Sequence, residues 1–317
     1  MKKWLSIVLA MMLLCMPLTS QAAGDVYVDT AAETFVHGET TLPYRLMLPQ
    51  DYDEDESYPL ILFLHGAGER GTDNLTQMKN VFQKIANKNP GAILLAPQCN
   101  QENQWVDTPW ENGPYSTDEV SESNELQAVM ALLEQIQENY SVDKDRIYAT
   151  GLSMGAFGVW DLMVRHNDVF AAGVACCGGG DPSKGEFLKD TPMYVFHGDA
   201  DPTVPVTGSR DVVNAILEAG GETVFYTEYP GFPHGIWDIA FEEVGLFDAL
   251  LEHRLSDRYE IETEDISEDA EATEDANDSK EDAENTQLYI YIGVGVAVAL
   301  IIVIIVVVVL LKKKNKK

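Results

Sequence analysis

The chain has 317 residues, of which 52 are acidic and 21 basic, so its formal net charge at pH 7 is −31. A field of this sign repels DNA, RNA and anionic lipid headgroups, which argues against nucleic acid as a partner. The length fits one large domain with appended segments.

The N-terminal segment has the parts of a secretory signal peptide. Lys2 and Lys3 give it a charged start, an apolar run of about a dozen residues follows, and small residues close it at Ala22-Ala23. The apolar run is too short for a transmembrane helix, which needs about 20 residues. We therefore predict export, with residues 1–23 as the signal peptide.

Between this segment and residue 255, apolar runs that predict strands alternate with segments of helical periodicity. Most of these runs are continuously apolar, as in strands buried on both faces of a parallel sheet, while the first two are predicted to be antiparallel. The alternation predicts an α/β domain over residues 24–255, with a mostly parallel sheet covered by helices on both faces. The predicted strands are residues 26–28, 42–48, 58–64, 92–96, 146–150, 172–175, 193–196 and 223–229, and the predicted helices are residues 125–140, 157–165, 209–219 and 239–254.

Two further segments follow the domain. Residues 256–287 are rich in Glu, Asp, Ser and Thr and too polar to form a core, which predicts a disordered acidic linker; the alternative is a tail without a role. Residues 288–311 are apolar throughout and long enough to cross a bilayer, and the lysine-rich residues 312–317 are predicted to stay cytoplasmic. The sequence therefore predicts a single-pass membrane protein whose folded domain faces outward.

The pentapeptide Gly151-Leu152-Ser153-Met154-Gly155 lies between a predicted strand and a predicted helix. In that context a G-x-S-x-G pattern indicates a nucleophile elbow, in which the serine occupies a sharp turn with its hydroxyl exposed. The pattern alone is weak, because glycine and serine are common in ordinary turns. Ser153 is our candidate nucleophile.

A serine hydroxyl needs a base to take its proton, and a carboxylate to orient that base. Asp201 follows the predicted strand 193–196, and His234 follows the last predicted strand, which gives the chain order Ser, Asp, His. We predict His234 as the general base and Asp201 as its orienting carboxylate. Asp199 competes for the carboxylate role, but we expect it to cap the turn instead.

Backbone amides that stabilise an oxyanion are expected at the same end of the sheet. The amide of Met154 directly follows the nucleophile, and the glycine-rich loop of residues 64–71 offers the amide of Ala67 as a second donor. The alternative for this loop is a plain glycine turn. We expect His65, in the same loop, to have a structural role.

Taken together, these residues resemble the α/β-hydrolase family, within which the chain is most similar to secreted esterases of the phospholipase/carboxylesterase, feruloyl-esterase-like and predicted-peptidase groups. The resemblance covers residues 42–252 and implies an α/β-hydrolase fold with a catalytic triad. It says little about the substrate. It rests on the loop 64–71, Asp145-Arg146-Ile147-Tyr148 before the pentapeptide, His197-Gly198-Asp199-Ala200-Asp201, and His234-Gly235.

Trp105 and Trp110 lie in a long loop near the same sheet end, where their rings either line a substrate site or pack beneath the loop. Only about 17 residues separate the strands that end near residue 175 and begin at residue 193, which leaves room for a minimal lid alone. Cys99, Cys176 and Cys177 are an odd number of cysteines, so no complete disulfide framework is predicted, and a single bridge to Cys99 stays open. We expect no metal site and no cofactor.

The sequence therefore predicts an extracellular, membrane-anchored serine esterase that acts on small-molecule or polysaccharide-linked carboxylic esters, feruloyl and acetyl esters among them, through an acyl-enzyme. A serine peptidase of the same fold is the first alternative. A surface binding protein that has kept the scaffold without activity is the second.

Overall fold

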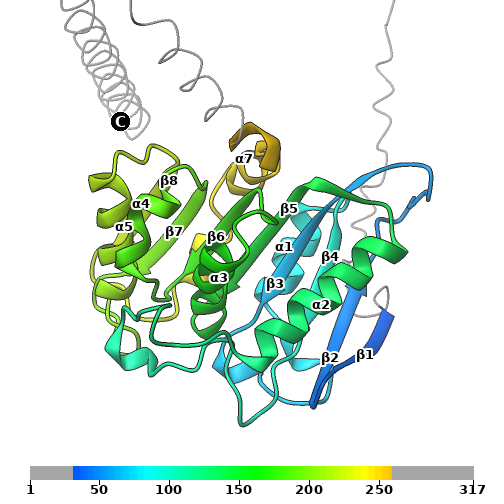
Figure 1. The fold of residues 1–317 in the computed structure, drawn as a ribbon, viewed down its shortest axis with the longest axis horizontal. Helices are drawn as coiled ribbons and strands as arrows, with labels where there is room; N and C mark the ends of the chain where they lie inside the picture. Colours follow the sequence, from blue (N-terminus) through cyan, green and yellow to red (C-terminus); the bar gives the residue numbers. More distant parts are fainter. Residues whose placement is uncertain (1–30, 259–317) are drawn as a thin grey trace, which may run out of the picture. The chain divides into compact units, whose positions relative to one another are not determined.

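A computed structural model describes residues 31–258 of the chain. Eight strands form one sheet in the order β1-β2-β4-β3-β5-β6-β7-β8 (Figure 1). The strands are β1 (Ala31–His37), β2 (Thr40–Met47), β3 (Tyr58–Leu64), β4 (Ile93–Pro97), β5 (Val142–Leu152), β6 (Ala172–Cys176), β7 (Met193–Gly198) and β8 (Val224–Tyr229). The strands β1 and β2 are antiparallel to their neighbours, and β4, β3, β5, β6, β7 and β8 run parallel.

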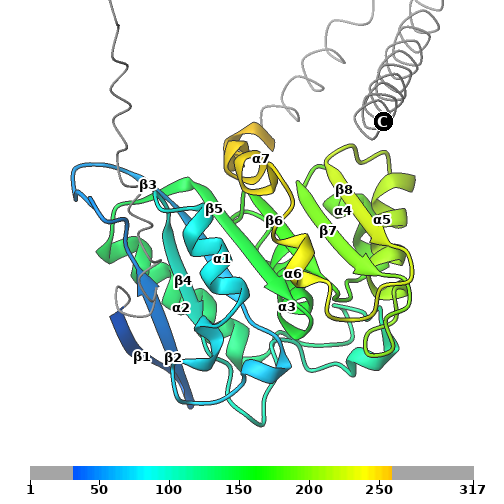
Figure 2. The ribbon, with the colours of Figure 1, turned by 180° about the vertical axis from the view of Figure 1, so that it is seen from behind.

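Helices cover both faces of the sheet. One face packs against α2 (Asn124–Asn139), α3 (Met154–Arg165), α4 (Gly185–Leu188) and α5 (Thr207–Glu218), and the other against α1 (Val81–Lys88), α6 (Trp237–Ala240) and α7 (Leu246–Glu252) (Figures 1 and 2). The side chains of β3 alternate between the two layers: Leu60, Leu62 and Leu64 enter the first core, and Ile61 and Phe63 enter the second. Each fully buried side chain of this size contributes roughly 1.5–3 kcal/mol, so the alternation fixes the strand's register.

This architecture is the predicted α/β-hydrolase fold. Every strand predicted within the described residues is present, although the ends differ by a few residues. The run at residues 26–28 lies outside the described residues. The segment between β6 and β7 contains a 3-10 turn (η5, Pro182–Lys184) and the one-turn helix α4, which agrees with a minimal lid.

Three elements differ from the prediction. The strand β1 lies at the edge of the sheet and is almost entirely exposed, so its sequence has no apolar pattern that would predict a strand. The helix α1 was not predicted, although Val81, Phe82 and Ile85 have helical spacing. The single helix expected over residues 239–254 was wrong, because Gly245 takes a left-handed conformation (φ +84°) and separates α6 from α7.

The folded part also extends past the predicted boundary at residue 255. Ser256 donates hydrogen bonds from its backbone N–H and its hydroxyl to the Asp145 carboxylate. The Arg258 guanidinium is buried and donates to the backbone carbonyls of Asn167 and Phe170. Residues 256–258, assigned to the linker from composition alone, are therefore held by specific hydrogen bonds to the domain.

Among the helices of residues 31–258, none is long and apolar enough to cross a membrane. The predicted signal peptide (residues 1–23), the rest of the predicted linker (residues 259–287), the predicted membrane span (288–311) and the lysine-rich tail (312–317) lie outside the described residues.

Candidate active site

The carboxyl ends of the parallel strands meet at one edge of the sheet. The register pairs Leu64 with Gly151, Leu152 with Cys176, and Cys176 with Phe196. Loops that leave these strands therefore start side by side, which is how residues far apart in sequence reach one site. Each predicted catalytic residue lies in or just after such a loop.

Ser153 occupies the sharp turn between β5 and α3, with φ +52° and ψ −121°. A positive φ is rare for a residue with a Cβ, and it is retained here because the turn is tightly packed on both sides. A Cβ on Gly155 would lie 1.9 Å from the carbonyl oxygen of Leu64, and one on Gly151 would lie 2.4 Å from the carbonyl oxygen of Gly155. The glycines of the pentapeptide are therefore required by backbone contact.

His234 lies in the loop after β8 and connects Ser153 to Asp201. Its Nε2 is 2.8 Å from the Ser153 Oγ, and its Nδ1 is 2.6 Å from the Asp201 Oδ2. Because a carboxylate only accepts hydrogen bonds, Nδ1 carries the proton, which leaves Nε2 free to accept the serine proton. The structure thus joins the three predicted residues in one hydrogen-bonded chain.

The Asp201 carboxylate is enclosed, with no exposed side-chain surface. Its Oδ1 accepts the backbone N–H groups of Thr203 (2.8 Å) and Val204 (3.0 Å). Burial by itself raises the pKa of Asp201, but hydrogen bonds from His197, His234 and these two amides outweigh burial and hold that pKa well below its usual range. The carboxylate is therefore ionised wherever the protein is folded at neutral or mildly acidic pH.

The expectation that Asp199 caps the turn was wrong, because the Oδ1 of Asp201 accepts the turn's backbone N–H groups. The Asp199 carboxylate is exposed and accepts the backbone N–H of Gly231 at 2.5 Å, which ties the loop after β7 to the loop after β8. It is Asp201, as predicted, that contacts His234.

The loop after β3 lies against the nucleophile. A Cβ built on Gly66 would be 3.5 Å from the Ser153 Cβ, and Ala67 begins the 3-10 turn η2 (Ala67–Glu69) that follows. The Met154 N–H belongs to the first turn of α3 and so has no partner within the helix. The backbone amides of Ala67 and Met154 are thus carried by the two segments that flank Ser153.

His65 is fully buried and fixes this loop. Its Nε2 accepts the backbone N–H of Cys99 at 2.9 Å, and its Nδ1 donates to the carbonyl oxygen of Gly66 at 2.7 Å. The Gly66 carbonyl and the Ala67 N–H belong to one planar peptide group, so holding the first also orients the second. Burial lowers the pKa of His65 to about 4, in agreement with the structural role expected for it.

A family described as "Putative esterase" matches residues 38–297 of the chain. The chain belongs to this esterase family. A "Probable feruloyl esterase C" from Aspergillus niger is 26% identical over 59% of this chain and 64% of its own length. The crystal structure of a thermostable esterase is 38% identical, with a TM-score of 0.64 over 72% of this chain and 64% of that one. The chain thus spans less than two thirds of the length of either relative.

The fold also occurs outside the esterases. A puromycin-hydrolysing peptidase from Mycobacterium tuberculosis has a TM-score of 0.53 with 14% identity, over 72% of this chain and 40% of that one. Identity this low shows a shared fold only.

The two tryptophans predicted near the site have different positions in the fold. Trp105 is fully buried and donates its Nε1–H to the carbonyl oxygen of His65 at 3.0 Å, so of the two alternatives it packs beneath the loop and does not line a substrate site. Its indole packs beneath the loop because the buried carbonyl needs a donor. Trp110 is half-buried, has the Arg70 guanidinium 6.0 Å from its ring centre, and lines a hollow of about 410 Å³.

Sequence reasoning gave no site role to three residues near the triad. Trp237 is half-buried and meets His234 edge to face at 5.3 Å; its position three residues after His234 was the available signal. His197 is fully buried beside Asp201, and its place at the start of the segment 197–201 was the available signal. Cys177 is the residue after β6 and has a left-handed backbone conformation (φ +55°).

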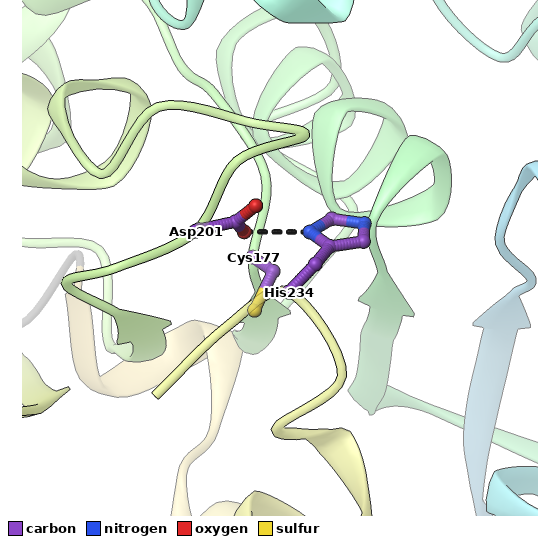
Figure 3. Close-up of side chains that lie close together, drawn as sticks. All are labelled: Cys177, Asp201 and His234. Carbon is purple, nitrogen blue, oxygen red and sulfur yellow. Dashed lines mark hydrogen bonds and ion pairs between the residues drawn. The ribbon is translucent and has the colours of Figure 1, made fainter. Parts of the chain in front are cut away.

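Cys177 completes the one group of potential metal ligands found within residues 31–258. Its Sγ and the ligand atoms of Asp201 and His234 all lie within 4.8 Å of one another, and Figure 3 shows the three side chains with the Asp201–His234 hydrogen bond. A thiolate, an imidazole and a carboxylate suit Zn²⁺. A metal bound there would displace the Nδ1 proton of His234 and break that hydrogen bond. Two of the three potential ligands, Asp201 and His234, are thus already engaged in the hydrogen bonds that connect Ser153, His234 and Asp201.

Within the described part of the chain, Cys99, Cys176 and Cys177 are buried and form no disulfide. The bridge to Cys99 that the sequence left open is therefore absent there. Burial raises the pKa of the Cys99 thiol far above its ordinary value, so it packs as a small neutral side chain.

Proposed function

We propose that this chain is a serine esterase that hydrolyses carboxylic esters through an acyl-enzyme. The observation that carries the proposal is the pair of contacts made by His234, 2.8 Å to the Ser153 Oγ and 2.6 Å to the Asp201 Oδ2. These distances suit transfer of the serine proton to a base whose tautomer is already fixed.

The reaction follows from this arrangement. Ser153 Oγ attacks the ester carbonyl while its proton passes to His234 Nε2, and Asp201 stabilises the imidazolium that forms. The amides of Ala67 and Met154 donate hydrogen bonds to the oxyanion of the tetrahedral intermediate. His234 then protonates the departing alcohol, and the acyl group remains on Ser153. Water, deprotonated by His234, attacks the acyl-enzyme, and the acid leaves as the serine is reprotonated.

The substrate we propose is an ester of a small aromatic acid or of acetic acid, free or attached to a polysaccharide. The name of the Aspergillus niger relative supports the aromatic acid, and a relative from Neocallimastix patriciarum named as a bifunctional acetylxylan esterase/xylanase supports the acetyl group. The half-buried ring of Trp237 meets His234 and offers an apolar face at the site, and the ring of Trp110 lies beside Arg70 in the loop after β3. The minimal lid leaves the approach open to a polymer.

Labelling with a fluorophosphonate tests the nucleophile. The purified full-length chain is expected to be labelled, Ser153→Ala is expected to lose the label, and Ser57→Ala, which changes an exposed loop serine, is expected to keep it. An unlabelled wild-type protein would contradict the proposal. Assays with ethyl ferulate, p-nitrophenyl acetate and a peptide p-nitroanilide then separate esterase from peptidase. Faster turnover of the anilide would favour the peptidase.

We further propose that the domain is exported and anchored by residues 288–311, with the acidic segment as a tether. The charged start, short apolar run and small residues at the N-terminus support export, and the apolar stretch followed by lysines supports the anchor. Deleting the residues after Gln287 is expected to release active enzyme into the medium. Retention of the shortened protein at the membrane would contradict the anchor.

A further inference from the structure

A second histidine reaches the carboxylate that orients His234. His197, at the end of β7, has no exposed surface, and its Nε2 lies 3.2 Å from the Asp201 Oδ2 and 3.0 Å from the carbonyl oxygen of Val204. The same Oδ2 accepts the Nδ1–H of His234 at 2.6 Å. Two imidazoles therefore share one carboxylate oxygen, and only one of them contacts the serine.

The partners of His197 require a hydrogen on its Nε2. Both neighbours of Nε2, a carboxylate and a carbonyl, can only accept hydrogen bonds, so Nε2 must carry a hydrogen. Its Nδ1 is 2.8 Å from the hydroxyl of Ser209, and that hydroxyl is 2.9 Å from the carbonyl oxygen of Gly178. Ser209 is itself fully buried and fixes the plane of the ring.

Other ionisable groups near His197 are already engaged. Glu228 on β8 pairs with Arg210 on α5, through contacts of 2.7 and 3.0 Å, and the pairing lowers the pKa of Glu228. Tyr226 donates to the same carboxylate. On the β6 side, burial raises the pKa of the Cys176 thiol well above its ordinary value, and the Cys177 thiol belongs to the cluster around Asp201. Asp201 is thus the acidic group whose hydrogen bond to His197 bears on the triad.

We propose that His197 is a positioning residue that donates its Nε2–H to Asp201 and thereby limits how strongly Asp201 stabilises the protonated form of His234. The proposal rests on the proposed function of Ser153, Asp201 and His234. Its physical basis is competition: an oxygen that already accepts one N–H has less negative charge to offer a second. Without His197, the Asp201 carboxylate is expected to interact more strongly with His234.

Two variants of His197 separate positioning from packing. Glutamine places its amide near the former Nε2 and can still donate to Asp201, whereas asparagine places its amide near Nδ1 and reaches only Ser209. His197→Asn is expected to shift the acid limb of kcat/KM to higher pH by about half a unit or more, and His197→Gln is expected to keep it near the wild-type position. His166→Gln, which removes a half-buried histidine paired with Glu122, serves as the control. If the acid limb of the kcat/KM pH profile lies at the same pH in His197→Asn and in the wild type, the proposal is overturned.

A spectroscopic measurement on the wild-type protein provides a test that does not depend on activity. In the full-length protein labelled with ¹⁵N-histidine, long-range ¹H–¹⁵N spectra are expected to show hydrogen on His197 Nε2, with the signal assigned by its loss in His197→Gln. An unprotonated Nε2 would refute the proposal even if the enzyme is active. Failure of fluorophosphonate labelling with Nε2 protonated would instead count against the proposed function.

Discussion

Two histidine–glycine pairs end strands of the sheet, and the two histidines have opposite hydrogen-bond patterns. His65 follows β3 and His197 ends β7, and neither has any exposed surface. The Nε2 of His65 accepts an N–H from Cys99, so its proton lies on Nδ1, whereas the Nε2 of His197 faces two acceptors and must itself carry a proton. Similar local sequences therefore take different protonation patterns, because the surrounding groups set them. His65 contacts the peptide group between Gly66 and Ala67, and His197 contacts the Asp201 carboxylate.

The largest effect is expected on the β7 side. Asp201→Asn keeps the shape of the side chain but replaces an acceptor with a group that can donate to Nδ1 and so favours the wrong tautomer of His234. A fall in kcat of about 10⁴-fold is expected, measured with p-nitrophenyl acetate. Asp199→Asn is the matched control, since Asp199 ties the loop through Gly231 and does not contact His234; a loss of similar size there would contradict the assignment.

The second prediction concerns stability on the β3 side. Because the folded protein lowers the pKa of His65 from 6.5 to about 4, the unfolded chain binds the extra proton between these values. The contribution of His65 to stability is therefore complete above about pH 6.5 and is lost as the pH falls to 4, on the order of 3 kcal/mol. Urea unfolding at pH 7 and pH 4.5 measures this loss.

The control for that measurement is His65→Gln, which cannot titrate. It is expected to be less stable than the wild type at pH 7, since the Gly66 carbonyl loses its donor, but to show a smaller fall in the free energy of unfolding towards pH 4.5. An equal fall in both proteins would show that His65 is not the group responsible.

The third prediction tests whether the loop after β3 must lie close to Ser153. A Cβ on Gly66 would lie 2.7 Å from the Leu152 Cδ1, whereas one on Gly68 would have nothing within 4 Å. Gly66→Ala is expected to lower kcat by roughly 10- to 100-fold, because the displaced loop misplaces an oxyanion donor, and Gly68→Ala is expected to have little effect. Equal activity of the two variants would remove the support for Ala67 as a donor.

The smallest effect is expected at Trp110, next to the same loop. Trp110→Ala is expected to raise KM for ethyl ferulate by about two- to tenfold, because stacking on an aromatic ring contributes about 0.5–1.5 kcal/mol, and to leave KM for p-nitrophenyl acetate nearly unchanged. A uniform change for both esters would indicate a packing role for Trp110, like that of Trp105.

The sequence by itself determined the strand–helix alternation, the pentapeptide around Ser153 and the order of Ser153, Asp201 and His234. These features are local: continuous apolar runs mark buried strands, and parallel strands bring their carboxyl ends to one edge. The same reasoning placed Asp201 rather than Asp199 beside His234. The predictions for the two ends of the chain, the signal peptide and the membrane span, rest on sequence alone.

Only the tertiary structure decided what depends on contacts between distant segments. Whether Trp105 faced a substrate or the core depended on the His65 carbonyl, 40 positions away, that accepts its N–H. Gly245 divided the last predicted helix, and Arg258 extended the domain by binding carbonyls about 90 residues earlier. The role inferred for His197 has the same origin. Hydrogen-bond partners across a sheet edge are set by strand order and register, and neither can be predicted from a short segment of sequence.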